Sequence, residues 1–445
     1  MRATSLAAVV LAARAWADAP PVATIATDWT APGVVSRAAP SLQVVPNPLF
    51  RRSSPVHAAI QDALRALRAT RVRLVLWYPF PRLAVAALEP PGRWSTSWDF
   101  GELDPLVEDF VAATEGRPAI VNFSTVPQWL FATAAPVAAP ADVAEPAWRY
   151  QQGTALRDPT ATELAAYFAR LASWYVAGGF TDERGTRRTS PHRLAFDTWE
   201  VLNEPDAEHA MTAAQYATRY DAIVEAVRAV APDMKFAGPA LGTPDAPAGQ
   251  RFLKWFLDPR RHRPGVPIDL LTYHGYAVVF PDPATPSFLR TTPRPVGPCR
   301  TDAFGAVERF VQAVHRIERM KARRRPDLPT AIDEVGLLAG DETKQDRSNF
   351  VAKPLPPWWW NLSAAVFAYQ YARLAREGVA VVGASAPGTP STRTAAGRSH
   401  WFTTSTRRSP RAVRNAWAHT PSPVDVVSSS TSPGPQWSIS SSSAR

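Results

Sequence analysis

Two glutamates of this sequence close apolar, strand-like runs. Glu204 lies in WEVLNEPD (199–206), where Pro205 stops the run because its ring lacks the N–H that a continuing strand ladder needs. Glu334 lies in TAIDEVG (330–336), two residues before Gly336. Since α/β barrels assemble their active sites at the carboxyl ends of their strands, both side chains are candidates for acid–base chemistry.

A pair of carboxyl groups suits the hydrolysis of a glycosidic bond with retention. That reaction needs the two groups about 5–5.5 Å apart, one to protonate the leaving oxygen and one to attack the anomeric carbon. Two nearby negative charges with partial burial raise one pKa, and the group with the raised pKa becomes the acid. Two alternatives stay open: Glu204 could be a turn-forming carboxylate, and Glu200, on the same strand face, could compete as the acid. We prefer Glu200 as an interior carboxylate paired with Arg73, about one barrel layer below the mouth.

Short β-like runs alternate with helical patterns along the body of the chain, which is typical of β-α units and a parallel sheet. Eight strands are predicted, the number that a closed (β/α)8 TIM barrel requires. They are 42–46, 72–77, 119–124, 196–204, 234–240, 268–276, 330–335 and 379–385. Glu204 and Glu334 would end the fourth and seventh strands, which face each other across the mouth.

Helices are predicted over 57–69, 103–114, 161–177, 212–230, 250–257, 303–323 and 359–377. The fourth has the clearest pattern. Its apolar stripe recurs at i, i+4, i+7, i+8, i+11 and i+14 from Tyr216, and Thr212 with Gln215 forms a T-x-x-Q capping box. We therefore expect this helix to pack with the stripe against the barrel.

With these elements in place, the sequence resembles glycoside hydrolase family 39, within the clan A of (β/α)8 retaining glycosidases. The resemblance covers roughly residues 40–385. The stretches that carry it are WEVLNEPD (199–206), QYATRYDAIVEAV (215–227), IDLLTYHGY (268–276), AIDEVG (331–336), SWDFGELDPLVEDF (97–110) and NFSTVPQWLF (122–131). The resemblance implies that Glu204 is the general acid/base and Glu334 the nucleophile. It also implies that Asn203 binds the sugar 2-hydroxyl, a contact that contributes most in the oxocarbenium-like transition state.

Further site residues follow from the same resemblance. His274 and Tyr276 look like the family's His-x-Tyr pair, which orients the nucleophile and lines the sugar site, and Arg73 looks like the clan's strand-two arginine. A nearby positive charge favours the ionised form of a carboxyl group. Trp77 and Trp129 are candidate platforms for sugar rings. A core histidine, a structural arginine and core-packing tryptophans remain the alternatives.

Composition sets the domain boundaries. With 445 residues and 46% hydrophobic content, the chain can bury one large core. Residues 1–17 are predicted to be a secretory signal peptide, 18–41 an N-terminal extension and 42–385 the catalytic barrel. In 386–445, 29 of the 60 residues are Ser, Thr or Pro, so we expect a disordered tail and an incomplete eighth β-α unit. A natural low-complexity tail and a non-native reading frame both explain this segment.

The net charge of +10 lies mostly outside the predicted barrel. Residues 386–445 carry +6, and Arg2 and Arg14 add +2, which leaves the body near +2. We therefore expect no nucleic-acid partner. No run approaches the length of a membrane span, so no membrane partner is expected either. The predicted chemistry requires no metal and no cofactor.

The sequence thus predicts a secreted retaining glycosidase with a carbohydrate substrate, of β-xylosidase-like or α-L-iduronidase-like activity. The alternative is a catalytically inactive carbohydrate-binding barrel, which the incomplete eighth unit would favour. A third class is a basic scaffold protein that binds anionic polymers through residues 386–445. The oligomeric state is not indicated.

Overall fold

The computed structural model describes residues 36, 38–135, 137–147, 150, 153–279, 297–339 and 357–385. The side chains of 278–279, 297–302, 338–339 and 357–360 are outside this description. The predicted signal peptide (1–17), residues 18–35 and 37 of the N-terminal extension and the tail (386–445) also lie outside the described residues.

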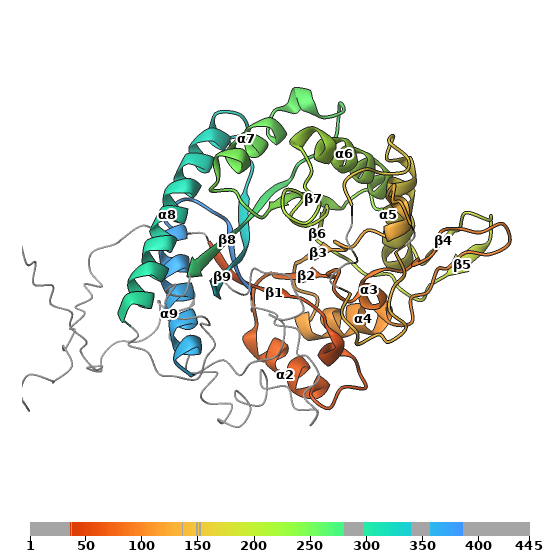
Figure 1. Ribbon diagram of the computed structural model, residues 1–445, viewed down its shortest axis with the longest axis horizontal. Coiled ribbons are helices and arrows are strands. Elements are labelled where there is room, and N and C mark those ends of the chain that lie inside the picture. Colours follow the sequence, from red (N-terminus) through yellow and green to blue (C-terminus); the bar gives the residue numbers. More distant parts are fainter. Residues whose placement is uncertain are drawn as a thin grey trace, which may run out of the picture. The chain divides into compact units, whose positions relative to one another are not determined.

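Eight parallel strands form a closed barrel at the centre of the described chain (Figure 1). The strands are β1 (Ala39–Val44), β2 (Val72–Val75), β3 (Ala119–Asn122), β6 (Thr198–Glu200), β7 (Lys235–Leu241), β8 (Leu270–Val279), β9 (Thr330–Ala339) and β10 (Val381–Ser385). Neighbours in the chain pair in order, and the ring closes where Ala39–Gln43 pair with Val381–Ser385. The predicted barrel and its eight strands are therefore confirmed.

The fourth barrel strand, β6, is shorter than predicted. The apolar run suggested 196–204, but the regular strand covers only Thr198–Glu200. The chain departs from extended geometry soon afterwards, since Leu202 and Glu204 have φ angles of 59° and 38°. The prediction that Glu204 ends the strand is thus wrong in detail, because Glu204 lies on a left-handed turn beyond the strand end.

Seven helices with predicted counterparts surround the strands (Figure 1). They are α2 (His57–Leu67), α4 (Leu103–Thr114), α5 (Thr162–Val176), α6 (Ala213–Val230), α7 (Pro247–Phe256), α8 (Gly297–Ala322) and α9 (Pro357–Leu374). The capping box of α6 is present, with Thr212 accepting from the Gln215 N–H and the Gln215 side chain accepting from the Thr212 N–H. In the apolar stripe, Tyr216 to Val227 are buried and Val230 is half-buried.

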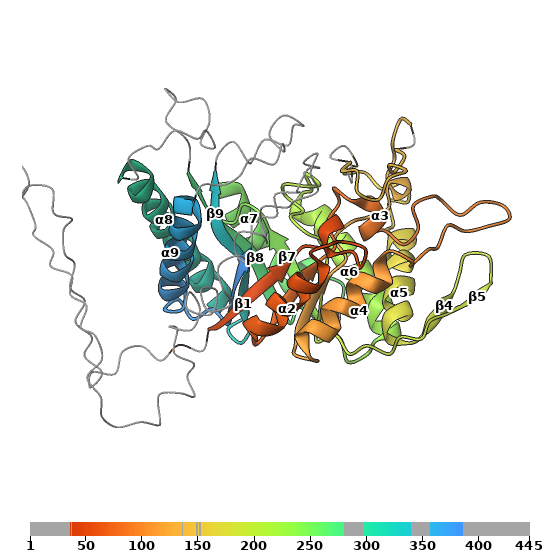
Figure 2. The same cartoon turned by 90° about the horizontal axis from the view of Figure 1, so that it is seen from below.

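Several short elements have no counterpart in the sequence prediction. They are α3 (Pro81–Ala84), η1 (Pro48–Phe50), η2 (Gln128–Leu130), η3 (Pro259–Arg261) and the hairpin β4–β5 (Gly179–Thr181 and Arg187–Thr189). Figure 2 shows the hairpin projecting from the barrel, and its two strands form a separate antiparallel sheet. β5 has the sequence RRT, and a three-residue strand of this kind shows no alternation of apolar and polar residues. Hydrophobic periodicity therefore could not predict the hairpin.

The core has two parts, on the two faces of the strands. A small apolar layer fills the barrel interior with Ile120, Ala237, Leu270, Ala331 and Val381, one residue from each of five strands. The larger part lies between the strands and the helices. Because the interior apolar layer is small, the remaining interior positions of the barrel can hold the polar residues described below.

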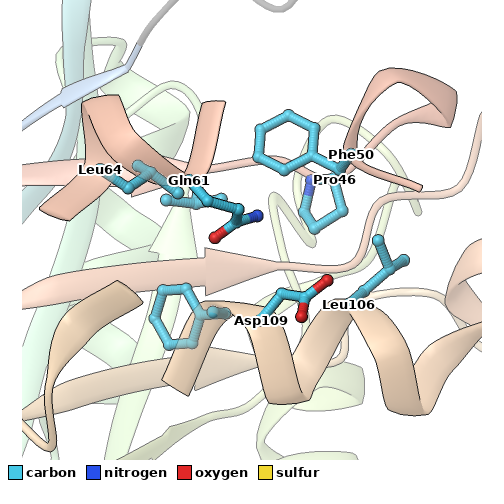
Figure 3. Close-up of a pocket in the computed structure, with 8 residues that line it drawn as sticks. Pro46, Phe50, Gln61, Leu64, Leu106 and Asp109 are labelled. Atoms are coloured by element: carbon cyan, nitrogen blue, oxygen red, sulfur yellow. The ribbon is translucent and has the colours of Figure 1, made fainter. Parts of the chain in front are cut away.

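A narrow crevice lies between α2 and α4, beside the end of β1 (Figure 3). Its lining is mostly apolar, with Phe50, Leu64 and Leu106 among the lining residues and Gln61 and Asp109 as the polar ones. None of the lining residues belongs to the polar network of the barrel interior. Among the described helices, none has the length and apolarity needed to cross a membrane.

Candidate active site

The buried guanidinium of Arg73, on β2, is the centre of a polar network inside the barrel. Its Nη1 donates to Oε1 of Glu334 at 2.5 Å, and its Nε donates to Oε2 of Glu200 at 2.7 Å. Its Nη2 donates to Oδ1 of Asn203 at 2.7 Å, and Nη1 also donates to Oε1 of Gln43. The predicted pairing of Arg73 with Glu200 is present, and one side chain joins β1, β2, β6 and β9.

Two residues of β8 contact Glu334, which lies on the adjacent strand β9. The Tyr276 hydroxyl donates to Oε2 of Glu334 at 2.5 Å, and Nε2 of His274 lies 3.5 Å from Oε1 of Glu334. Nδ1 of His274 lies 2.7 Å from Oε1 of Glu204. His274, which is fully buried, therefore lies between the two predicted catalytic carboxyl groups.

Glu204 is held by the turn that follows β6. Its N–H donates to the Ala240 carbonyl, and Asp206 accepts hydrogen bonds from the N–H groups of Gly242 and Thr243. These contacts fix a backbone that includes two non-glycine residues in the left-handed region. Such strained positions persist where the surrounding structure holds them and are often found at active sites.

One oxygen of Glu204, one oxygen of Glu334 and one ring nitrogen of His274 all lie within 4.8 Å of one another. This upper limit on the distance between two carboxyl oxygens is close to the carboxyl separation of retaining glycosidases, about 5–5.5 Å, and lies below the roughly 6.5–9.5 Å of inverting enzymes. The same three side chains could also hold a metal ion. Glu334, however, accepts hydrogen bonds from Arg73 and Tyr276.

The pKa values of the network follow from its charges. Burial acts to lower the pKa of Arg73, but Asp333, Glu200 and Glu334 outweigh it and raise that pKa. Burial acts to raise the pKa of Glu334, but His274, Arg73 and the Tyr276 hydrogen bond lower it. The pKa of Glu200 is lowered against burial chiefly by Arg73. Glu334 and Glu200 are therefore favoured in their ionised forms.

Two further carboxyl groups are favoured in their neutral forms. Burial and the charge of Glu200 raise the pKa of Asp333 well above its usual range, against the effect of Arg73. Burial of the carboxyl group and the charge of Glu204 raise the pKa of Glu208 to about 8. Burial opposes the charging of His274, but Glu334 and Glu204 raise its pKa to about 9.

The described part of the site thus gathers five carboxyl groups around two cationic side chains. The carboxyl groups are those of Glu200, Glu204, Glu208, Asp333 and Glu334, and the cations are Arg73 and His274. An uncompensated charge in a buried site is costly, so some of these acids retain a proton. The neutral forms of Asp333 and Glu208 meet that requirement.

The two predicted tryptophan platforms differ in their surroundings. The Trp77 indole donates to Oε1 of Glu208 at 2.7 Å and so joins the network. The Trp129 indole donates to the Ala87 carbonyl, and the guanidinium of Arg157 lies 4.5 Å from its ring centroid. Neither of these two contacts involves a carboxyl group of the network, and the role of Trp129 as a sugar platform stays a prediction.

Sequence reasoning missed four polar residues of the network. Asn122 donates to Glu200 at 2.8 Å and to the Leu202 carbonyl, and Gln43 accepts from Arg73. Asp333 and Glu208 were also overlooked. A polar residue inside an apolar strand run was the available signal for Gln43, Asn122 and Asp333, whereas Glu208 lies on a turn without periodicity.

No protein-family model and no curated protein sequence matches the chain. Solved structures do resemble it. The GH51 arabinofuranosidase from Xanthomonas axonopodis pv. citri superposes with a TM-score of 0.51 at 14% identity, covering 80% of this chain and 68% of that one. A GH39 β-xylosidase from Caulobacter crescentus gives a TM-score of 0.45 at 16% identity, covering 80% and 63%. A glucosidase from Croceicoccus marinus gives 0.46 at 16% identity, covering 79% and 60%.

The chain therefore has the (β/α)8 barrel fold that the arabinofuranosidase has, as the sequence predicted. It spans about three fifths of the length of the glucosidase and the β-xylosidase. Membership of family 39 stays a prediction, as do the roles of individual residues.

Proposed function

We propose that the protein is a retaining glycoside hydrolase that uses Glu204 and Glu334. The observation that carries the proposal is the approach of one oxygen of each carboxyl group, together with His274, to within 4.8 Å. Glu204 lies on the turn after β6 and Glu334 lies on β9, and the approach of their oxygens fits a double displacement better than a direct attack by water. Resemblances to solved glycosidases support the same reaction class.

In the first step, Glu204 gives a proton to the glycosidic oxygen while Glu334 attacks the anomeric carbon. The bond to the leaving sugar or alcohol breaks, and a glycosyl ester with Glu334 forms. In the second step, Glu204 takes a proton from water, the water oxygen bonds to the anomeric carbon, and the Glu334 carboxylate is released. Nδ1 of His274 lies 2.7 Å from Oε1 of Glu204 and is placed to donate a hydrogen bond to the Glu204 carboxylate once it has given up its proton.

The surrounding residues have distinct proposed roles. Arg73 and Tyr276 keep Glu334 ionised and fixed for attack, since both donate hydrogen bonds to its oxygens. Asn203 binds the hydroxyl next to the reacting carbon, and Trp77 borders the sugar. A β-xylosidase-like specificity, an α-L-iduronidase-like one and export from the cell remain part of the proposal and rest on sequence alone.

The test is hydrolysis of a panel of nitrophenyl glycosides by the wild type, Glu204→Gln and Glu334→Gln. Each substitution should lower kcat by about a hundredfold or more, because general acid–base and nucleophilic catalysis contribute on that scale. Glu115→Gln, at an exposed carboxylate after α4, serves as the matched control and should retain activity. The first product, followed by NMR, should keep its anomeric configuration.

Two results would contradict the proposal. An inverted first product would exclude the double displacement. A wild type that matches both variants on every substrate but still binds sugar would identify the inactive carbohydrate-binding barrel instead.

A further inference from the structure

Glu208 follows Glu204 by one turn of the chain, and its carboxyl group turns back into the site. Its N–H donates to the Glu204 carbonyl at 2.7 Å. Its Oε1 accepts two hydrogen bonds, from Nε1 of Trp77 at 2.7 Å and from Nδ2 of Asn203 at 2.9 Å. A single oxygen therefore joins the two side chains that the proposed function assigns to the sugar.

The hydrogen bond to Glu208 fixes which way the side-chain amide of Asn203 is oriented. The amide oxygen of Asn203 accepts from Arg73, while its Nδ2 donates to Glu208. A flipped amide would place Nδ2 against the Arg73 donor and Oδ1 against the Glu208 acceptor, and both hydrogen bonds would be lost. Since a side-chain amide has two N–H donors, one hydrogen of Asn203 remains for a substrate hydroxyl.

The second oxygen of Glu208 lies in a different environment. Part of the residue is exposed, but Oε2 is shielded from solvent and has no hydrogen-bond partner among the described residues. A neutral carboxyl group suits such a place, because the carbonyl oxygen can still accept from both N–H groups. The raised pKa of Glu208, about 8, is consistent with this form at neutral pH.

We propose that Glu208 is a positioning residue that orients Asn203 and Trp77 for the sugar through its acceptor oxygen Oε1. This inference rests on the proposed function. Glu208 does not touch the reacting atoms, because its free oxygen is enclosed, and it acts through the amide and the indole that it holds.

The kinetic test compares Glu208→Gln and Glu208→Ala on the best nitrophenyl glycoside and on its 2-deoxy analogue. Glutamine keeps an acceptor oxygen and is a neutral isostere of the acid, whereas alanine removes the acceptor. Glu208→Ala should lower kcat/KM about tenfold to a hundredfold on the hydroxylated substrate and markedly less on the 2-deoxy analogue. Glu208→Gln should stay within about threefold of the wild type on both substrates.

A second measurement does not depend on turnover. The indole N–H resonance of Trp77, assigned with Trp77→Phe, should move in Glu208→Ala and stay near its wild-type position in Glu208→Gln. If the wild type hydrolyses no glycoside, the proposed function fails, while this resonance still reports whether Glu208 holds Trp77.

Three outcomes would overturn the inference about Glu208. The first is an unchanged kcat/KM in Glu208→Ala on the hydroxylated substrate, and the second is an equal loss on both substrates. The third is an indole resonance of Trp77 that does not respond to Glu208→Ala.

Discussion

Nη1 of Arg73 lies 2.5 Å from Oε1 of Glu334, which joins the second barrel strand to the seventh across the interior. Arg73 is 1% exposed, and it also contacts Glu200 at 2.6 Å and Asp333 at 3.2 Å. A single buried cation thus faces three carboxyl groups. Both the stability of the barrel and the ionised state of Glu334 depend on it.

Replacing Arg73 with methionine should destabilise the protein strongly. Methionine has a similar length but leaves Glu200 and Glu334 buried without their cation, and breaking a buried pair in this way costs about 3–5 kcal/mol. Urea unfolding at pH 7 measures the effect. Arg52→Met, at a partly exposed ion pair with Asp109, is the control and should cost about 1 kcal/mol or less. Equal unfolding free energies for the two variants would contradict the assigned role of Arg73.

Tyr276→Phe should shift the acidic limb of the pH–rate profile upward. The hydroxyl donates to Oε2 of Glu334 and helps to lower the pKa of that carboxyl group, so its removal raises the pKa of the proposed nucleophile. A hydrogen bond to a charged group contributes about 1.5–3 kcal/mol, which corresponds to a shift of about one to two pH units.

The profile of kcat/KM against pH measures this shift. The matched control is Tyr371→Phe on α9, which removes a hydroxyl that donates a hydrogen bond to the Ala38 carbonyl. An acidic limb at the same pH in all three proteins would show that Tyr276 does not act on Glu334.

Gly242→Ala should impair catalysis more than folding. A Cβ at this position would lie 2.9 Å from Cδ and 3.0 Å from Oε1 of Glu204, so the carboxyl group must move. The end of a glutamate side chain can shift at little cost, but a displaced catalytic group loses about a hundredfold in rate for about 1 Å. We expect a fall in kcat of about tenfold to a hundredfold with Tm nearly unchanged.

The control for Gly242 is Gly305→Ala on α8, where the nearest atom beyond the helix backbone is 3.5 Å away. That variant should keep its kcat. A Gly242→Ala protein with wild-type kcat would mean that the position of Glu204 is not restricted by the loop after β7.

The unfolding free energy should fall as pH rises from about 6.5 to 9. The folded pKa of His274 is raised to about 9, above the value near 6.5 of an unfolded histidine. The stabilisation is therefore complete below about pH 6.5 and is lost as pH rises through the folded pKa, a change of up to about 3 kcal/mol. Glu208, whose folded pKa is raised to about 8, also lowers the free energy of unfolding as pH rises toward that value.

The difference between wild type and His274→Gln isolates the histidine, with urea unfolding measured at several pH values. His274→Gln should show a flatter dependence, whereas His315→Gln, at an exposed histidine of α8, should follow the wild type. Parallel curves for wild type and His274→Gln would exclude a charged His274.

The barrel strands were predictable because buried parallel strands read as short continuous apolar runs. The apolar stripe that begins at Tyr216, with the T-x-x-Q motif before it, predicted α6 and its capping box. The interior position of Glu200 followed from strand periodicity, and the choice of Arg73 as its partner followed from the resemblance to the clan's strand-two arginine. The left-handed turn at Glu204 could not be predicted, because no glycine in the sequence marks it. Glu208 and Asp333 were missed since their significance depends on side chains from other strands, and the role of Trp129 stays a prediction because a strand-end position does not tell which way a ring points.

The pairing of β1 with β10 has a consequence for biosynthesis. Gln43, on the first strand of the ring, accepts a hydrogen bond from Arg73 on the second, and Glu334, which also accepts from Arg73, lies on the seventh. A ribosome that has translated only the first three hundred codons has therefore made Arg73 without Glu334 and β1 without its second neighbour. The emerging chain exposes two unpaired strand edges until β10 leaves the exit tunnel, and unpaired edges make that interval prone to aggregation.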